Sequence, residues 1–146
     1  MEVQEIIQAM SNKGMRITEQ RKTLARLFVD HEGYLTPKEV YEAMVQTYAG
    51  MSFDTVYRNL RVLQEMDIVE QFMFEDGIKF RLRCHTDEHH HHFICLECER
   101  TIPFHYCPMD HVQQYPEGFK PVKHKFDIYG YCETCQSGQS RQAAAR

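Results

Sequence analysis

Apolar residues recur every three or four positions from residue 1 to residue 65, which predicts four amphipathic helices. Each set of apolar positions would face a common core. The four sets are Val3, Ile6, Ile7 and Met10; Leu24, Leu27 and Phe28; Val40, Met44 and Val45; and Val56, Leu60 and Leu63. The first half of the chain is therefore predicted to be helical.

Residues that favour helix ends flank these segments. Thr18, Thr36 and Ser52 each stand where an N-cap is needed. Glu39 follows Thr36 by three positions and can complete a capping box. Gly50 ends the third segment before the fourth begins. These residues predict where the last three helices start.

The fourth helix carries Tyr57, Arg58 and Arg61 on the side opposite its apolar positions. An exposed face with one aromatic residue and two arginines is typical of a recognition helix that enters the major groove of DNA. A solvated charged face is the alternative, and it is common for any single helix. The segments that follow favour the first interpretation.

Two segments with a two-residue period, 67–74 and 78–84, flank Glu75, Asp76 and Gly77 and predict a hairpin. Even-numbered positions are mostly apolar in both segments, so we expect even-numbered residues to lie opposite one another. With a short loop centred on Gly77, the residue numbers of each opposed pair add up to 154, which places Glu70 opposite Cys84. The odd positions of the second segment carry Lys79, Arg81 and Arg83. Helices followed by such a wing with one basic edge predict a winged helix-turn-helix.

The chain changes character after Cys84 and becomes rich in histidine and cysteine. We predict an α+β protein with a DNA-binding domain at 1–84, a hinge at 85–88, and a small α/β dimerisation and metal-binding domain at 89–136. Within the second domain we expect a helix at 108–116 and a strand leading to Gly130. Residues 137–146 lack apolar side chains and are predicted to be a disordered tail.

Composition narrows the functional classes. The 146 residues carry a net charge of −4, so any contact with nucleic acid must come from a local basic patch. No segment approaches the roughly 20 apolar residues that span a bilayer, and the N-terminus does not resemble a signal peptide. We therefore expect a cytoplasmic protein with no membrane partner. Six cysteines in a reducing compartment favour metal binding over disulfides.

The strongest metal-binding motif is a pair of C-x-x-C knuckles. Its members are Cys95, Cys98, Cys132 and Cys135. Two knuckles that present four thiolates form the usual structural zinc site, with no open position for catalysis. Two disulfides are the alternative. The sequence therefore predicts one structural Zn²⁺ in the second domain.

Four consecutive histidines precede the first knuckle, and alternation along a strand would place them in two pairs. His90 and His92 could share a metal with Glu70 and Cys84, which would explain an acid and a thiol among apolar neighbours. His89 and His91 need distant partners, for which Asp110 and His124 are candidates. That second set lacks sulfur and fits zinc, iron or manganese. A solvated histidine run is the alternative.

Together these motifs resemble the ferric uptake regulator family over nearly the whole chain. The resemblance is carried by TPKEVY at 36–41, SFDTVYRNL at 52–60, HHHHFICLEC at 89–98 and CETC at 132–135. It implies a dimeric transcription factor, usually a repressor, that binds AT-rich inverted repeats when metal is bound. It also supports His89, His91, Asp110 and His124 as a further metal site.

Within that family the sequence looks like the zinc uptake regulators. Iron, manganese and peroxide sensors typically have a histidine where Tyr34 stands, and zinc sensors have a cysteine eight residues before the position of His92, where Cys84 stands. One departure is Pro103, which replaces an acid found in many members. Cys107 fits none of the predicted sites.

The predicted function is zinc-responsive repression of zinc uptake genes by a homodimer that binds double-stranded operator DNA. Each chain would hold the structural zinc and one or two regulatory zinc ions. The predicted DNA contacts are Arg16, Ser52, Thr55, Tyr57, Arg58, Arg61 and Lys79. A regulator of iron, nickel or peroxide response is the alternative. A zinc hydrolase is disfavoured because no H-E-x-x-H motif is present, and a zinc buffer would not need the basic helix face.

Overall fold

The computed structural model describes residues 1–84, 88–112 and 114–137. The chain divides into two compact units, Met1–His85 and Thr86–Arg146, called here the first and second unit. Most of the predicted hinge, and the predicted tail from residue 138 onward, lie outside the described residues. Within the described ranges, no helix has the length and apolar character to cross a membrane.

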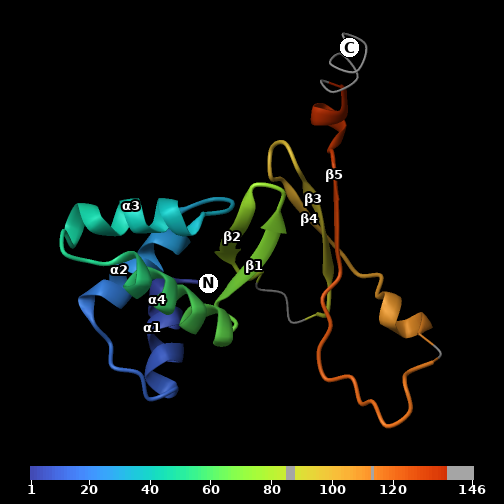
Figure 1. The fold of residues 1–146 in the computed structure, drawn as a ribbon, viewed down its shortest axis with the longest axis horizontal. Coiled ribbons are helices and arrows are strands. Elements are labelled where there is room, and N and C mark those ends of the chain that lie inside the picture. Colours follow the sequence, from blue (N-terminus) through green and yellow to red (C-terminus); the bar gives the residue numbers. More distant parts are fainter. Residues whose placement is uncertain (85–87, 113, 138–146) are drawn as a thin grey trace. The chain divides into compact units, whose positions relative to one another are not determined.

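The first unit begins with four helices, shown in Figure 1. They are α1 Val3–Asn12, α2 Glu19–Asp30, α3 Pro37–Thr47 and α4 Phe53–Glu65. The hydroxyl groups of Thr18, Thr36 and Ser52 accept hydrogen bonds from backbone N–H groups in the first turns of α2, α3 and α4. Glu39 completes the capping box at Thr36. The predicted starts of these helices are confirmed because each cap satisfies a donor that the helix leaves unpaired.

The apolar faces of the helices converge on one core. Ile6, Val40 and Leu60 are completely buried, and Leu24 and Val56 are nearly so. The same core includes Val69 and Phe80 from the two strands that follow. The hydrophobic pattern of the sequence therefore predicts this core correctly.

The hairpin forms as predicted, but its register differs. Strands β1 Val69–Phe74 and β2 Gly77–Leu82 pair antiparallel, with Phe74 opposite Gly77 and Glu70 opposite Arg81. Glu70 is therefore not paired with Cys84, and that prediction is wrong. The cause is the two-residue turn at Glu75 and Asp76, which pairs odd positions with even ones.

This register divides the apolar residues of the hairpin between its two faces. Val69 and Phe80 lie in the helical core, together with the partly buried Ile78 and Leu82. Phe72 lies opposite Lys79 and so projects from the other face, because directly opposed residues share a face. There Tyr34 contacts Phe72 and Phe74 edge-on, with ring centroids 5.1 Å apart in each pair. The expected separation into an apolar and a basic face is confirmed for β2, but it is wrong for β1, because Phe72 and Phe74 lie on the face of Lys79 and Arg81.

The second unit is built on a three-stranded sheet with the order β4-β3-β5. The strands are β3 His91–Cys95, β4 Thr101–Phe104 and β5 Asp127–Gly130. Strand β3 pairs antiparallel with β4 and parallel with β5. The sheet and the winged helix confirm the predicted α+β class.

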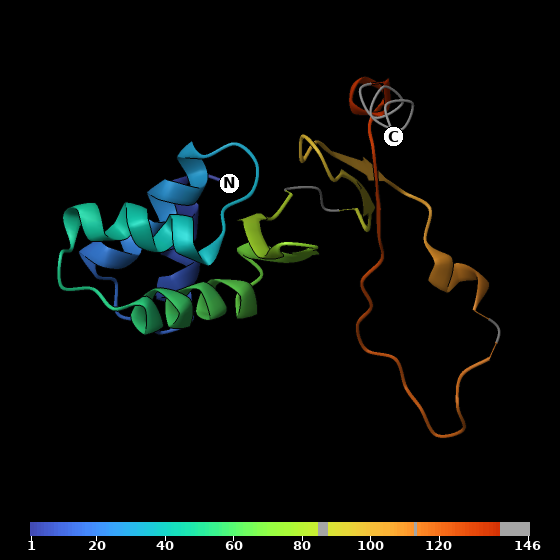
Figure 2. The ribbon, with the colours of Figure 1, turned by 45° about the horizontal axis from the view of Figure 1, so that its top comes forward.

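The connection between β4 and β5 departs from the prediction. Instead of a helix at 108–116 there is one short 3₁₀ helix, η1 Pro108–His111. Residues 114–126 form neither helix nor strand, and they run out and back between η1 and β5 (Figure 2). Pro116 disfavours helical backbone at Tyr115, so it is unfavourable for the predicted helix to extend to residue 116.

Candidate metal and DNA-binding sites

The two cysteine knuckles lie at the same end of the second unit's sheet. Cys95 ends β3, and Cys132 follows β5 by two residues. Because β3 and β5 are parallel and Cys95 pairs with Gly130, both strands end at the same end of the sheet. The four sulfur atoms of Cys95, Cys98, Cys132 and Cys135 lie within 4.8 Å of one another. The predicted four-cysteine group is therefore assembled, and none of these residues forms a disulfide.

The spacing of these sulfur atoms fits a metal ion. A tetrahedron with Zn–S bonds of about 2.3 Å has edges of about 3.8 Å. The Sγ atoms of Cys98 and Cys132 are 3.7 Å apart. Thiolates present in this arrangement could hold one Zn²⁺ without a free coordination position, which is the pattern of a structural site.

The thiol groups influence one another's ionisation. Burial acts to raise the pKa of Cys95, but N–H groups of Cys132, Cys98 and Glu97 donate to its sulfur and lower the pKa to about 6. The hydrogen bond with Cys132 raises the pKa of Cys135 to about 12. A hydrogen bond from the N–H of Cys135 lowers the pKa of Cys132 as well, so within this cluster it is the Cys135 thiol that resists ionisation. A divalent cation removes that resistance because it compensates the accumulated negative charge.

The histidine run separates into two pairs, as alternation along an extended chain predicts, although β3 itself begins at His91. The Nε2 atoms of His89 and His91 are 3.1 Å apart. The rings of His90 and His92 meet edge-on with centroids 4.8 Å apart. His91 and His92 are both buried, with exposed fractions of 4% and 5%. These histidines are therefore not a solvated run.

His89 and His91 belong to a group that includes a thiol. The Nε2 atom of His124 lies 3.1 Å from Nε2 of His89 and 3.4 Å from Sγ of Cys107. The ligand atoms of all four residues are within 4.8 Å of one another. Asp110, the predicted fourth member, is exposed on η1 and is not part of this group. The group therefore contains sulfur, contrary to expectation.

The protonation state of His91 suits metal binding. Burial lowers the pKa of His91, and the nearby His89 and His124 rings lower it further when they are charged. A lowered pKa keeps the imidazole neutral near pH 7, and the neutral ring is the form that binds a metal ion.

Asp127 lies behind His92 and was not identified from the sequence. Its Oδ1 atom is 3.8 Å from Nδ1 of His92, because β5 pairs these two residues across the sheet. Burial acts to raise the pKa of Asp127, but the interactions with His92 and Lys125 outweigh it and lower the pKa. A carboxylate at Nδ1 orients a histidine whose Nε2 binds a metal. Parallel pairing between distant segments leaves no local pattern that would have revealed it.

The first unit holds the two other residues of the predicted regulatory site. Cys84 accepts a hydrogen bond from Nη2 of Arg81, at 3.0 Å. The Oε2 atom of Glu70 is buried and has no hydrogen-bond partner among the described residues. A buried carboxylate oxygen without a partner is costly unless a cation or a water molecule satisfies it. Glu70 itself is half-buried, it is in none of the groups of converging ligand atoms found among the described residues, and its predicted position opposite Cys84 is lost.

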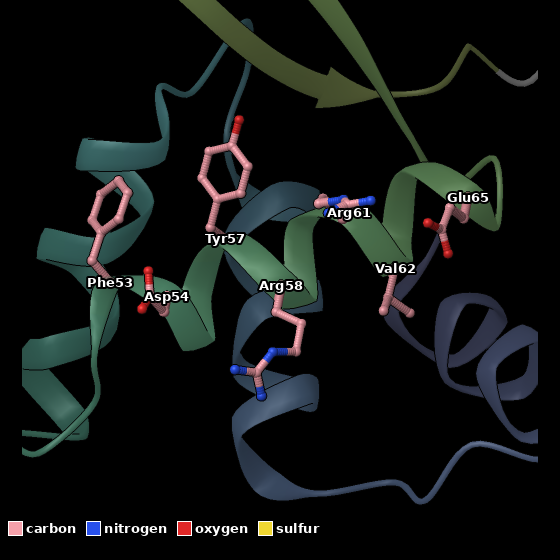
Figure 3. A pocket seen from close by; sticks show the side chains of 7 residues that line it. All are labelled: Phe53, Asp54, Tyr57, Arg58, Arg61, Val62 and Glu65. Carbon is pink, nitrogen blue, oxygen red and sulfur yellow. The ribbon is translucent and has the colours of Figure 1, made fainter.

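The exposed side of α4 carries the predicted recognition residues. Tyr57, Arg58 and Arg61 line a shallow groove with Phe53 and Glu65, and Figure 3 shows Tyr57 and Arg58 leaving the helix on different sides. Both arginines are exposed, whereas Tyr57 is half-buried and its ring centroid is 6.2 Å from that of Phe53. Two exposed guanidinium groups beside a positioned aromatic ring are suited to a DNA groove.

The other predicted DNA contacts differ in availability. Arg16 is exposed, and Ser52 and Thr55 lie at the start of α4, where their hydroxyl groups are 2.9 Å apart. Lys79 is less accessible, because only 15% of its side chain is exposed and its Nζ atom lies 4.7 Å from the centre of the Phe74 ring. The residues near α4 are therefore more accessible for DNA contacts than Lys79.

The fold and the motifs correspond to one family of proteins. The model of the ferric uptake regulator family matches residues 12–129. The chain belongs to this family, whose members are metal-responsive regulators of transcription that bind DNA and are not enzymes. The expectation of a regulator rather than a hydrolase is thereby confirmed.

Similar proteins include iron, manganese and zinc regulators. The ferric uptake regulation protein of Staphylococcus aureus strain Mu50 is 38% identical over 136 residues, covering 93% of this chain and 99% of the relative. A solved zinc-bound manganese uptake regulator is 30% identical, with a TM-score of 0.56 and coverage of 87% and 98%. A zinc uptake regulator solved with zinc and DNA has a TM-score of 0.71 at 22% identity, covering 96% and 99%. The last similarity concerns the fold alone.

Proposed function

We propose that the protein is a zinc-responsive repressor that acts in the cytoplasm on zinc uptake genes. As a homodimer it binds AT-rich inverted repeats when zinc is bound. The structural zinc is held by the four-cysteine group. The regulatory zinc is held by Cys84, His90 and His92, with Glu70 as the proposed fourth ligand.

One observation, the composition of the ligand set, carries the choice of zinc over iron. Cys84 adds a thiolate, and Tyr34 stands at the position where iron sensors typically have a histidine. Soft sulfur in a four-coordinate site suits Zn²⁺, whereas nitrogen and oxygen ligands suit iron and manganese. Tyr34 is 5% exposed and packs between Phe72 and Phe74, so this position serves the core of the wing.

The proposed dimer is supported by the surface of the second unit. Phe93, Ile102, Ile128 and Tyr131 are exposed and line one shallow apolar groove on its sheet. Strand β5 is an edge of that sheet. An exposed apolar patch beside an edge strand is typical of an association surface.

The proposed switch follows from where the ligands are in the sequence. Cys84 belongs to the first unit, and His90 and His92 belong to the second. A metal ion shared by these residues would supply a link between the wing and the dimerisation domain. In a dimer, restricting the position of both first units would favour one spacing of the two α4 helices over two operator half-sites.

An iron-responsive regulator is the second candidate. It is favoured by the 38% identity to proteins named for ferric uptake regulation. The two candidates predict different metal dependence of DNA binding.

The test is operator binding by the full-length dimer at controlled concentrations of free metal, measured by fluorescence anisotropy under anaerobic conditions. A fragment recovered by selection from genomic DNA supplies the operator. We expect Zn²⁺ to increase affinity at free concentrations far below those at which Fe²⁺ or Mn²⁺ act. Tight binding induced by Fe²⁺, with little response to Zn²⁺, would establish the iron-responsive candidate instead.

A further inference from the structure

We propose that Cys107 is the thiolate ligand of a second regulatory metal site, completed by His89, His91 and His124. This set of three imidazoles and one thiolate would favour zinc over manganese and ferrous iron. The inference rests on the proposed function only in assuming that the second unit binds a regulatory metal. It assigns a ligand that the sequence left without a role.

The position of Cys107 directs it into this group. It immediately precedes η1 and is 6% exposed, whereas the flanking Tyr106 is 59% exposed. Its Sγ atom lies 3.4 Å from Nε2 of His124. Asp110 stands three residues later on η1 and is exposed. The short 3₁₀ helix therefore turns the thiol inward and leaves the carboxylate outside.

The distances agree with a tetrahedral site of mixed ligands. With Zn–N bonds of about 2.0–2.1 Å and a Zn–S bond of about 2.3 Å, the N–N edges are about 3.3 Å and the N–S edges about 3.6 Å. The corresponding distances are 3.1 Å for His89 to His91, 3.1 Å for His89 to His124, and 3.4 Å for Cys107 to His124. Each differs from the ideal edge by a few tenths of an ångström.

At most one of the two close contacts made by Nε2 of His89 can be a hydrogen bond. A neutral imidazole carries one N–H, so each Nε2 atom can either donate one hydrogen bond or accept. Nε2 of His89 faces the Nε2 atoms of both His91 and His124, and one proton on His89 satisfies only one of them. A cation at the centre would satisfy all of the converging lone pairs together.

A buried cysteine is often a small apolar residue of the core, and this is the alternative role for Cys107. The surroundings favour a ligand instead. Its sulfur contacts an imidazole nitrogen, and that nitrogen belongs to a group of three histidines. A thiol that only filled space would not need to face these nitrogen atoms.

A cobalt titration identifies the ligand directly. Co²⁺ bound by a thiolate gives a sulfur-to-metal charge-transfer band in the near ultraviolet, and tetrahedral Co²⁺ gives intense visible bands. The experiment uses full-length protein with zinc in the four-cysteine site and the substitution Cys84→Ser, so that Cys107 is the remaining thiol outside that site. Zinc content is measured before and after titration to confirm that Co²⁺ has not replaced the structural ion.

We expect the Cys84→Ser protein to show both sets of bands. Adding Cys107→Asp should abolish the charge-transfer band while a carboxylate preserves visible bands. Adding Asp110→Asn, the matched control, should change neither. The proposal is overturned if the Cys84→Ser protein binds Co²⁺ without a charge-transfer band, or if Asp110→Asn removes bound Co²⁺ while Cys107→Asp retains the unchanged spectrum.

This outcome is separable from that of the proposed function. Cobalt spectra identify ligands and involve no DNA, whereas the operator assay identifies the metal that controls binding. A Cys107 thiolate band in a protein that responds to iron would support this inference and contradict zinc-responsive repression.

Discussion

Each of the two units of this chain is stabilised in a different way. In the first unit a continuous apolar core joins four helices and a hairpin. Among the described residues of the second unit, the buried apolar side chains are Ile94, Cys95 and Cys107, and two of these are thiols in candidate metal groups. We therefore expect the first unit to fold by hydrophobic burial, and the second to depend on metal binding and on association with another chain.

Removal of the structural metal should have the largest effect and should act on one unit. Metal binding at structural zinc sites is worth about 10–16 kcal/mol. We expect Cys95→Ser to lose the tightly held zinc, to unfold the second unit and to dissociate the dimer, while α1–α4 stay folded. Zinc analysis, sedimentation and hydrogen exchange resolved along the chain would measure this. Cys84→Ser is the matched control, and a zinc-free Cys95→Ser dimer with a protected sheet would contradict the expectation.

A core truncation in the first unit should have the opposite pattern. Leu60 on α4 is completely buried, so Leu60→Ala should destabilise the first unit by about 2–5 kcal/mol. Zinc retention and dimerisation should be unchanged. Chemical denaturation monitored by circular dichroism measures the loss, and the half-buried Leu27→Ala should cost less. Loss of the structural zinc in Leu60→Ala would show that the units do not fold independently.

Substitutions on the exposed side of α4 should reduce DNA affinity without changing the response to zinc. An arginine that reads a base edge contributes ~1–3 kcal/mol of discrimination, so Arg58→Ala should weaken specific binding by roughly 5- to 150-fold. We expect Tyr57→Ala to weaken it as well. Anisotropy titrations with operator and scrambled DNA measure this, with Lys38→Ala on α3 as the control. Unchanged operator affinity in both variants would remove α4 from the interface.

The smallest effect concerns a helix cap. Thr36 accepts the hydrogen bond from the N–H of Glu39 at 3.1 Å, and Thr36→Ala should cost the first unit about 1 kcal/mol. Thr36→Ser retains the hydroxyl and should restore most of the stability. Denaturant midpoints of both variants provide the measurement. Equal destabilisation by alanine and serine would mean that the methyl group, rather than the cap, matters.

Local sequence patterns predicted the first unit better than the second. The helix starts at Thr36 and Ser52 depend on residues within one turn, so a local sequence pattern is enough to predict them. The pairing of Glu70 depends on turn length, and the two-residue turn moves its partner by three positions, from Cys84 to Arg81. The alternation of apolar residues predicted one apolar face for the hairpin. In the structure the second face also carries apolar residues, and Tyr34, from the segment before α3, packs on it.

The metal groups show the same limit. Alternation along an extended chain correctly separated His89 and His91 from His90 and His92, and the knuckle motif correctly grouped the four cysteines. The partners from distant segments could not be derived in this way. Asp110 was chosen on an expected helix that does not form, and Cys107 and Asp127 are placed by η1 and by parallel pairing. Cys107 did carry one signal, because it was a cysteine without a partner in a histidine-rich domain.

Parallel zinc titrations of operator binding show whether the response to zinc depends on ligands from both units. Cys84→Ser and His90→Ala should remain folded dimers that have lost the gain in affinity, a coupling of ~1–3 kcal/mol or roughly 5- to 150-fold. His89→Ala should only shift the response, because its metal group lies wholly in the second unit. A protein that loses the response through His89→Ala and keeps it through Cys84→Ser would contradict this mechanism.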